Sequence, residues 1–432
     1  MVLGLALGCS DEAPNPGGAA GGSAGGDAGS PSSGGGLNSA GSGGVAGALG
    51  SDAGSTNAAG SPAAGTNSAG GLPSAAGAAN DGGADSQSGS GGGGASAGSA
   101  AGGSAGSAAA GAGGMAGAGG AGGGAGGDCN SVTGQPIVTV GPSGAAFTTV
   151  QAALNSLSKT NTTPTQIRIA PGIYKEKLTV AVPKITLCGQ TGKASSTILT
   201  YGDNANTSNG NGGTLGTTGG ASTNMTGSDI SVENITFANS TPLGGSQAVA
   251  LLVSGNQVQF RNCRFLSFQD TLYVRKAKQY FRDCYVEGTV DFIFGDGTTV
   301  FDNCTVKNVG GGTAATAPNT EQSVPYGLVF LGGQLTADAS VKSGSVALSR
   351  NWGAYGAATF LKTTLGAHIS PVGWSPMGDN TLDTARFSEY KTSGPGANTG
   401  ARAAQSKQLS DAQAANYTLS NIFGGWVPSF SK

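Results

Sequence analysis

The fold can be predicted from the stretch Val258-Gln-Phe-Arg-Asn-Cys-Arg-Phe265, in which short runs rich in Val and Phe surround one asparagine. The same pattern occurs in Ile230-Ser-Val-Glu-Asn-Ile-Thr-Phe237, Tyr280-Phe-Arg-Asp-Cys-Tyr-Val286 and Val300-Phe-Asp-Asn-Cys-Thr-Val306. Repeats of about 20 residues that contain short strands and polar turns, but no helices, are typical of a parallel β-helix. Each repeat then forms one coil, and coils stack about 4.8 Å apart. The alternative is a β-sandwich whose strands resemble one another by chance.

The distribution of glycine divides the chain in two. Glycine occurs 82 times in 432 residues, and most of these glycines precede Asp128 in a tract of Gly, Ala and Ser. Such a tract buries too little apolar surface to offset the entropy of ordering its backbone, so we predict a disordered, low-complexity linker over residues 10–127. Residues 128–432 are the predicted all-β domain, with 147–157 as its best candidate for a helix.

The first nine residues form a short apolar run that ends in Gly8 and Cys9. This is the pattern of the end of a lipoprotein signal, although no Lys or Arg precedes the run. We therefore predict a lipid on Cys9 and an exported protein, held at the outer membrane or cell surface or else secreted. No stretch reaches the roughly 18 apolar residues of a membrane-spanning helix, so a lipid anchor is the only membrane contact that we predict.

The overall charge excludes one class of partner. The net charge is −2 and the isoelectric point is near 5.4, whereas phosphate binding needs a basic face. We expect no nucleic-acid partner, no cofactor and a monomer. No pair of cysteines has the C-x-x-C spacing of a zinc site, so we expect no metal.

Six cysteines remain to be assigned, one of them Cys9. Cys263, Cys284 and Cys304 occupy the same position of the repeat, so stacked coils would bring them close together. Neighbouring coils would place Cys284 and Cys304 within the Cα separation of a disulfide, about 4.4 to 6.8 Å. Both a disulfide and a row of buried thiols fit this pattern.

The scarcity of histidine limits the chemistry. The sequence has one histidine, His368, and a lone histidine usually has a structural role. The sequence also has no G-x-S-x-G motif for a serine nucleophile. Acid–base work is therefore expected to depend on carboxylates.

Four polar residues of the repeat are candidates for this work. Gln247, Gln269 and Asp291 are spaced 22 residues apart, and Asp270 follows Gln269. We expect these side chains to stack on one face, with the two carboxylates close enough for their pKa values to separate. One aspartate could then attack a carbonyl while the other donates a proton, with amide donors nearby for an oxyanion. Taken alone, each aspartate is more simply explained as a turn residue, and the stacked set of four carries the interpretation.

Basic and aromatic residues could complete such a site. Arg350 could keep an aspartate ionised, and Trp352 offers a flat apolar face to a sugar ring. A surface ion pair and a core tryptophan are equally compatible with these two residues. A basic cluster of Arg275, Lys276, Lys278 and Arg282 could attract a polyanion or form a solvated edge; both explanations stay open.

The chain resembles the pectinesterase (pectin methylesterase) family, which has a right-handed parallel β-helix. Five signature stretches of that family occur in order and span most of the predicted domain. They are Gly172-Ile-Tyr-Lys-Glu176, Gln247-Ala-Val-Ala-Leu251, Gln269-Asp-Thr-Leu272, Asp291-Phe-Ile-Phe-Gly295 and Leu348-Ser-Arg-Asn-Trp352.

The resemblance implies a role for each polar residue of the site. Asp291 would be the nucleophile and Asp270 the acid that later acts as base. Gln247 and Gln269 would line the oxyanion hole, and Arg350 would hold Asp291. The reaction so implied removes methyl esters from pectin through an acyl-enzyme, with methylesterified pectin as partner.

The resemblance also implies contacts to the sugar and a disulfide. Trp352, Tyr273 and Phe294 would contact the sugar, together with Val290 and, through a looser match, Thr218. The pair Cys284 and Cys304 matches a disulfide of bacterial members. The family usually has proline at the position of Asn351, so we expect this turn to be looser or to mark a subgroup.

Three other functions remain as alternatives. The first is an esterase or thioesterase of the same fold that acts on an acyl ester other than pectin. The second is a polygalacturonase or a calcium-dependent lyase, although few acidic residues surround Asp270 and Asp291. The third is a carbohydrate-binding protein without catalytic activity.

Overall fold

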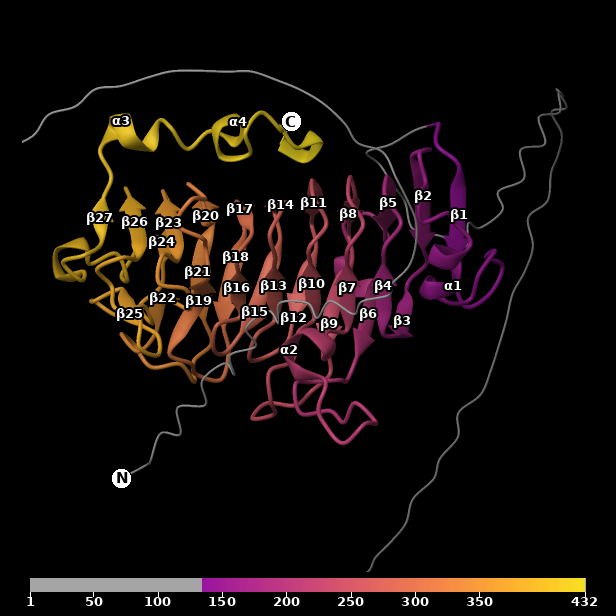
Figure 1. The fold of residues 1–432 in the computed structure, drawn as a ribbon, viewed down its shortest axis with the longest axis horizontal. Helices are drawn as coiled ribbons and strands as arrows, with labels where there is room; N and C mark the ends of the chain where they lie inside the picture. Colours follow the sequence, from indigo (N-terminus) through magenta and orange to yellow (C-terminus); the bar gives the residue numbers. More distant parts are fainter. Residues whose placement is uncertain (1–133, 432) are drawn as a thin grey trace, which may run out of the picture. The chain divides into compact units, whose positions relative to one another are not determined.

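The computed structural model describes residues 134–431, and its strands form three sheets in which neighbouring strands run parallel. From β2 to β26 the chain passes through one strand of each sheet in turn, and Figure 1 shows the resulting coils stacked side by side. The protein is a right-handed parallel β-helix, as predicted. The predicted signal remnant, linker and Cys9 lie outside the described residues.

The sheets differ in their number of strands. Sheet A has eleven: β1 (Ile137–Val140), β2 (Thr165–Ile169), β5 (Ile185–Cys188), β8 (Ser231–Glu233), β11 (Val258–Arg261), β14 (Lys278–Arg282), β17 (Thr298–Asp302), β20 (Leu328–Leu331), β23 (Ala357–Leu361), β26 (Arg386–Tyr390) and β27 (Lys407–Gln408). Sheet B has eight: β3 (Gly172–Lys175), β6 (Thr197–Tyr201), β9 (Thr236–Asn239), β12 (Arg264–Leu266), β15 (Tyr285–Gly288), β18 (Thr305–Asn308), β21 (Gln334–Ala337) and β24 (Thr364–Leu365). Sheet C has eight: β4 (Leu178–Val180), β7 (Thr223–Met225), β10 (Leu251–Val253), β13 (Leu272–Val274), β16 (Ile293–Gly295), β19 (Ala314–Pro318), β22 (Ala347–Asn351) and β25 (Trp374–Pro376).

The Asn or Asp of each repeat makes the turn from sheet A to sheet B. Asn234, Asn262, Asp283 and Asn303 all have left-handed backbone angles, with φ between 51° and 58°. Asn and Asp adopt this conformation more readily than other non-glycine residues, because their short polar side chains bond locally to the backbone. The turn therefore needs only that residue and the next one before the following strand begins.

The interior is filled by side chains that stack from coil to coil. Phe260, Phe281, Phe301, Phe330 and Phe360 occupy one register position of sheet A. Their rings stack with centroids 4.4 to 4.9 Å apart. Each is almost wholly buried, so this column supplies much of the apolar core that holds the coils together.

A short helix covers the first coils. Helix α1 (Val150–Asn155) lies within the predicted 147–157 segment and buries Val150 and Leu154 in the core. The carboxylate of Glu176 accepts hydrogen bonds from the backbone N–H groups of Val150 (2.8 Å) and Gln151 (2.9 Å). A carboxylate at a helix N-terminus satisfies free donors and complements the helix dipole. The first signature stretch, which ends in Glu176, thus stabilises this end of the fold.

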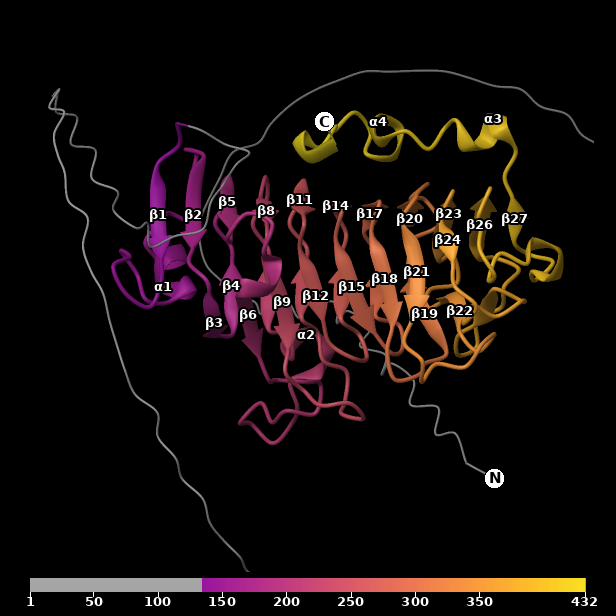
Figure 2. The same cartoon turned by 180° about the vertical axis from the view of Figure 1, so that it is seen from behind.

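The C-terminal tail packs on the outer face of sheet A. It contains α3 (Asp411–Ala414), α4 (Leu419–Ile422) and the 3₁₀ turn η3 (Ser429–Ser431), and it runs back from β27 towards β11 (Figures 1 and 2). Phe423 is buried against Tyr280, and the side-chain oxygen of Gln259 accepts a hydrogen bond from the backbone N–H of Phe430 (3.1 Å). The tail therefore covers apolar residues on a sheet other than the one that carries the candidate site.

Two further 3₁₀ turns, η1 (Ala194–Ser196) and η2 (Thr399–Ala401), and helix α2 (Gly216–Gly219) lie in connecting segments. Within residues 134–431, no helix is long and apolar enough to cross a bilayer.

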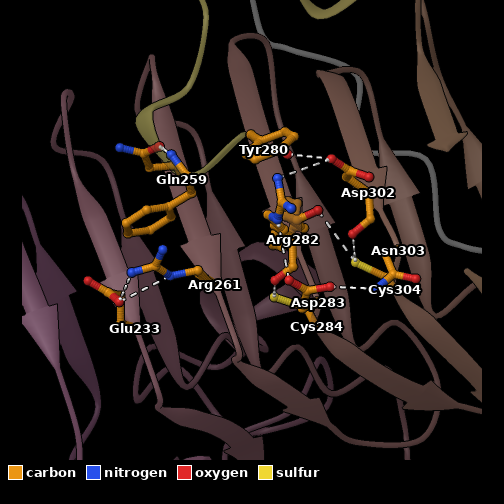
Figure 3. A network of polar contacts seen from close by, with 12 residues as sticks. Glu233, Gln259, Arg261, Tyr280, Arg282, Asp283, Cys284, Asp302, Asn303 and Cys304 are labelled. Atoms are coloured by element: carbon orange, nitrogen blue, oxygen red, sulfur yellow. Dashed lines mark hydrogen bonds and ion pairs between the residues drawn. The ribbon is translucent and has the colours of Figure 1, made fainter. Parts of the chain in front are cut away.

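The predicted disulfide between Cys284 and Cys304 is wrong. Both are free thiols, as is Cys263, and they stack on successive coils; Figure 3 labels Cys284 and Cys304. Parallel strands in register hold equivalent side chains about 4.8 Å apart and pointing the same way. A disulfide needs Cβ atoms about 3.5 to 4.5 Å apart, so this register keeps the sulfurs unbonded.

The thiols instead bond to the backbone. Cys284 Sγ donates to the carbonyl of Arg282 (3.3 Å), and Cys304 Sγ donates to that of Phe281 (3.4 Å). Burial and its thiol neighbours raise the pKa of Cys284 well above the ordinary value. Of the two arrangements that the repeat allowed, the structure therefore has the row of buried thiols. Cys188, in contrast, is disulfide-bonded.

Candidate active site

Asp270 and Asp291 lie side by side at the start of neighbouring strands of sheet C. Leu272 pairs with Ile293, so the aspartates two residues before them occupy equivalent positions on adjacent coils. Both have left-handed backbone angles (φ 65° and 50°) and are fully buried. Adjacent parallel strands are about 4.8 Å apart, so the two carboxyl groups are close neighbours, as predicted.

The two glutamines lie on neighbouring coils as expected, but Asp291 lies beside Asp270 and not beside Gln269. The backbone N–H of Ala248 donates to the carbonyl of Gln269 (3.1 Å), which places Gln247 and Gln269 on neighbouring coils. The N–H of Asp270 donates to the carbonyl of Val290 (3.2 Å), so Asp270 stands beside Asp291. The expectation that Gln269 and Asp291 are equivalent is therefore wrong, because β13 and β16 pair at an offset of 21 residues and not 22.

Arg350 holds Asp291 from two strands away. Its Nε donates to both carboxylate oxygens (2.8 and 3.0 Å), and its terminal Nη2 donates to Oδ2. The strand between them, β19, has Ala317 at the register position of Arg350, and its methyl side chain leaves room for the guanidinium. Forked contacts of this kind fix the orientation of a carboxylate as well as its charge.

Asp270 has no comparable partner. Neither of its carboxyl oxygens has a hydrogen-bond partner among the described residues. Burial raises the pKa of Asp270 well above the ordinary value; the neighbouring charge of Asp291 raises it further, and Arg350 opposes both. Leaving a buried polar group unpaired costs about 1–3 kcal/mol, which the rest of the fold must offset. Asp270 is therefore the group that holds a proton.

The pKa of Asp291 responds to two opposing effects. Burial raises it, while the hydrogen bonds and the charge of Arg350 lower it. Because Asp270 lacks these bonds, Asp291 ionises first, and its charge then keeps Asp270 protonated. The pair can thus supply an ionised carboxylate and a neutral acid at the same pH.

The two glutamines flank this pair. Gln247 is largely buried, and its Oε1 accepts a hydrogen bond from the Ser246 hydroxyl (2.7 Å), which leaves its Nε2 as the donor. Gln269 is half-buried and directly precedes Asp270. Neutral amide donors at this place suit the transient negative charge of an ester carbonyl oxygen.

Three aromatic side chains lie on the outer face of sheet C. Tyr273 stacks on Phe294 at 4.2 Å, and Trp352 is tilted against both rings, at 6.1 and 5.8 Å. We call these three residues the aromatic cluster. It belongs to a small apolar group, separate from the interior core, that also includes Ala317. The structure thus brings together three of the residues predicted to contact a sugar.

The other two predicted contact residues are more peripheral. Val290 is half-buried and supplies the backbone carbonyl that pairs with Asp270. Thr218 is exposed on helix α2, but Ala221, from the same connecting segment, packs in the apolar group of the aromatic cluster.

Asn351 fixes the turn that it was expected to loosen. Its side-chain amide donates to the carbonyl of Thr381 (2.8 Å). The amide of Asn380 in turn donates to the carbonyls of Asn351 (3.1 Å) and Trp352 (2.9 Å). Hydrogen bonds therefore hold this turn where a proline would restrict it covalently. The contribution of Asn380 and the spacer role of Ala317 could not be found without the strand register.

The basic cluster is dispersed. Lys276 pairs with Glu321 (2.7 Å), and Arg282 lies on sheet A beside Asp283 (3.3 Å), where Figure 3 shows it. Arg275 lies near the aromatic cluster, with its guanidinium 5.3 Å from the ring centroid of Tyr273. In residues 134–431, no three His, Cys, Asp or Glu residues are grouped so that they could hold a metal ion.

Comparisons with known proteins agree with this arrangement. The model of the pectinesterase family matches residues 137–425. Pectinesterase 31 of Arabidopsis thaliana is 38% identical over 282 residues, which cover 63% of this chain and 86% of that protein. The solved structure of pectin methylesterase PemA from Erwinia chrysanthemi superposes with a TM-score of 0.62 at 29% identity, covering 69% of this chain and 99% of that one. The pectin methylesterase from Yersinia enterocolitica gives 0.60 at 32% identity, covering 65% and 100%.

Proposed function

Because the chain belongs to the pectinesterase family of carboxylic ester hydrolases, we propose that it hydrolyses the C6 methyl esters of galacturonate in pectin and releases methanol. The observation that carries this proposal is the unequal pair of aspartates, in which Arg350 holds Asp291 while Asp270 is buried without a partner. One aspartate is then ready to attack and the other to donate a proton.

The first half of the reaction forms an acyl-enzyme. The Asp291 carboxylate attacks the ester carbonyl carbon, and the negative charge that develops on the carbonyl oxygen is stabilised by the amides of Gln247 and Gln269. As the intermediate collapses, the bond to the methoxy oxygen breaks and Asp270 gives that oxygen its proton, so methanol leaves. Asp291 is then acylated and Asp270 is ionised.

The second half restores both aspartates. Ionised Asp270 takes a proton from water as the water oxygen attacks the carbonyl carbon of the sugar. The bond to Asp291 breaks, which releases the galacturonate carboxylic acid and returns Asp291 as a carboxylate beside Arg350. Asp270 is again protonated, and no metal takes part in any step.

The aromatic cluster is the proposed sugar contact. Rings offer flat apolar faces, and Trp352, Tyr273 and Phe294 lie on the same outer face of sheet C as Arg350. We assign smaller contributions to the connecting segments that carry Val290 and Thr218.

The test is methanol release from methylesterified pectin by the full chain. Asp291→Asn should lower kcat by at least about 1,000-fold, because it removes the nucleophile while keeping the shape of the side chain. Asp302→Asn is the matched control, since Asp302 lies on sheet A and bonds to Tyr280. If the wild type releases no methanol, or if Asp291→Asn retains wild-type turnover, the proposal is wrong.

A divergent acyl esterase or thioesterase of the same fold is the second candidate. It is favoured only by Asn351, which stands where the family usually has proline. Thiol release from an acyl-thioester such as acyl-CoA, measured beside methanol release, discriminates the two: the proposal requires the methyl ester of pectin to react at least tenfold faster.

We also propose that the protein is exported and lipidated at Cys9, and that it acts as a monomer. The sequence pattern around Cys9 and the following Gly-rich tract support export. Mass analysis of the mature N-terminus should show an acylated cysteine, and sedimentation of the purified enzyme should give the mass of one chain.

A further inference from the structure

Arg275 lies immediately beyond strand β13, two residues after Tyr273 of the aromatic cluster. Residues two apart on a strand point to the same face. The guanidinium carbon is 5.3 Å from the centroid of the Tyr273 ring, which is the geometry of a cation–π contact. A positive charge thus borders the proposed sugar contact on the outer face of sheet C.

The backbone under this side chain is fixed on both sides. The N–H of Arg275 donates to the carbonyl of Val253 (2.8 Å), and its carbonyl accepts a hydrogen bond from the buried side chain of Gln279 (2.9 Å). Asp296, on the next coil, lies 3.9 Å from Arg275 Nε and also accepts the backbone N–H of Lys276 (2.9 Å). The ring of Tyr273 and the carboxylate of Asp296 together hold the guanidinium in place. The side chain of Arg275 therefore loses little further conformational freedom when it binds a ligand.

The donors of Arg275 remain available. Its guanidinium makes no hydrogen bond within residues 134–431, and the contact to Asp296 is too long to be one. Most other arginines of this part of the chain donate hydrogen bonds to carboxylates, amides or backbone carbonyls: Arg168, Arg261, Arg282, Arg350, Arg386 and Arg402. The side chain of Arg275 is 39% exposed, so a ligand can reach it.

We propose that Arg275 binds a free carboxylate of the same pectin chain whose methyl ester is being hydrolysed, and so makes the enzyme prefer partly de-esterified substrate. This inference rests on the proposed function. A planar guanidinium matches a carboxylate with two parallel hydrogen bonds, whereas a methyl ester carries no charge. Arg275 would therefore discriminate galacturonate from its methyl ester at a position away from the reacting sugar.

The charges of Asp291 and Arg275 both favour a partly de-esterified pectin chain. Ionised Asp291 repels a free carboxylate at the reacting position and accepts a neutral ester there. Arg275 offers the opposite charge at the far side of Tyr273. A chain with an ester over the aspartates and a carboxylate over Arg275 satisfies both.

The experiment compares Arg275→Gln with a matched control, Arg264→Gln. The guanidinium of Arg264 lies 5.2 Å from the ring centroid of Tyr285, in the same kind of contact, but on sheet B. Two quantities are measured at low ionic strength: binding of fully de-esterified galacturonate oligomers, and kcat/KM for methanol release from partly and from fully methylesterified oligomers.

Arg275→Gln should weaken binding of the de-esterified oligomers about three- to fivefold, and lower kcat/KM on the partly esterified substrate as much, through KM. Activity on the fully esterified substrate should be unchanged, and Arg264→Gln should match the wild type throughout. Added salt should reduce the wild-type preference.

Two results would overturn the proposal: a wild type that does not bind the de-esterified oligomers, or an Arg275→Gln variant that binds them as the wild type does. Binding is measured without turnover, so failure of methanol release with intact Arg275-dependent binding would refute the proposed function instead.

Discussion

Arg350 and Asp291 are joined by three hydrogen bonds across the intervening strand β19, while Asp270, on the coil next to Asp291, has no partner among the described residues. This inequality separates two chemically identical side chains into a charged one and a neutral one. Its consequences can be measured without assuming any particular substrate beyond a methyl ester.

Replacing Arg350 should move the pH dependence of the reaction. Its hydrogen bonds and charge lower the pKa of Asp291 against the effect of burial, so Arg350→Gln should raise that pKa. Asp291 must be ionised to attack, and therefore the acidic limb of the kcat/KM profile should shift to higher pH. Arg350→Lys, which keeps the charge but loses the fork, should shift it less. An acidic limb that stays in place in both variants would show that Asp291 does not govern it.

Replacing Asp270 should stabilise the fold while abolishing turnover. Its folded pKa is raised well above the ordinary value, so its contribution to the free energy of unfolding is fully present below pH 3.8. That contribution is lost as pH rises through the raised value, at about 1.4 kcal/mol for each unit of the shift. Asp270→Asn, which tolerates the left-handed backbone, should remove this loss.

Urea unfolding at pH 3.5 and pH 7 tests this prediction. Asp270→Asn should exceed the wild type in free energy of unfolding at pH 7 by at least about 1 kcal/mol more than at pH 3.5. Asp229→Asn is the control, because Asp229 is also left-handed (φ 58°) but is exposed. An equal effect of Asp270→Asn at both pH values would contradict the assignment of the proton to Asp270.

The stacked thiols should be present as thiols in the isolated protein. Alkylation under native conditions should leave Cys263, Cys284 and Cys304 unmodified, because they are buried and burial raises the pKa of Cys284. Alkylation after denaturation without reductant should label all three, which peptide mass analysis can count. A peptide pair linked through Cys284 and Cys304 would contradict the structure.

The C-terminal tail should contribute stability and not catalysis. Phe423 is fully buried beside Tyr280 on sheet A, so Phe423→Ala should cost about 3–5 kcal/mol of unfolding free energy. Turnover per folded molecule should persist, since the aspartates lie on sheet C. Val427→Ala, at a site 48% exposed in the same tail, should change stability little. The comparison needs only thermal unfolding and methanol release below the melting temperature.

Much of the fold followed from the sequence because a β-helix is a local repeat. The asparagine of Val258–Phe265 and its equivalents mark the same turn in each coil, and the apolar residues on either side fill the core. Asp270, Asp291 and Arg350 could be picked out because repetition and family resemblance agreed.

The remaining features could not be predicted because they depend on the register between strands of neighbouring coils. β13 and β16 pair at an offset of 21 residues, so the 22-residue spacing of Gln247, Gln269 and Asp291 did not place Asp291 beside Gln269. The disulfide between Cys284 and Cys304 failed for a related reason, since closeness of coils does not fix the distance and direction of two Cβ atoms. Asn351 shows the third limit: its partners come from residues 380 and 381, which no local pattern connects to it.

The turn from sheet A to sheet B limits where the coils can accept inserted residues. In the repeated coils it consists of only two residues, as at Asn262 and Cys263, and its backbone angle admits few residue types. The connection from sheet B to sheet C ranges from residues 176–177 before β4 to residues 202–222 before β7. The coils therefore vary in length mainly between sheets B and C, while the A-to-B turn stays at two residues except after β5, where residues 189–196 intervene. Because the connections between sheets B and C lead directly into sheet C, residues inserted there lie next to the candidate site. The short turns between sheets A and B keep the coils aligned.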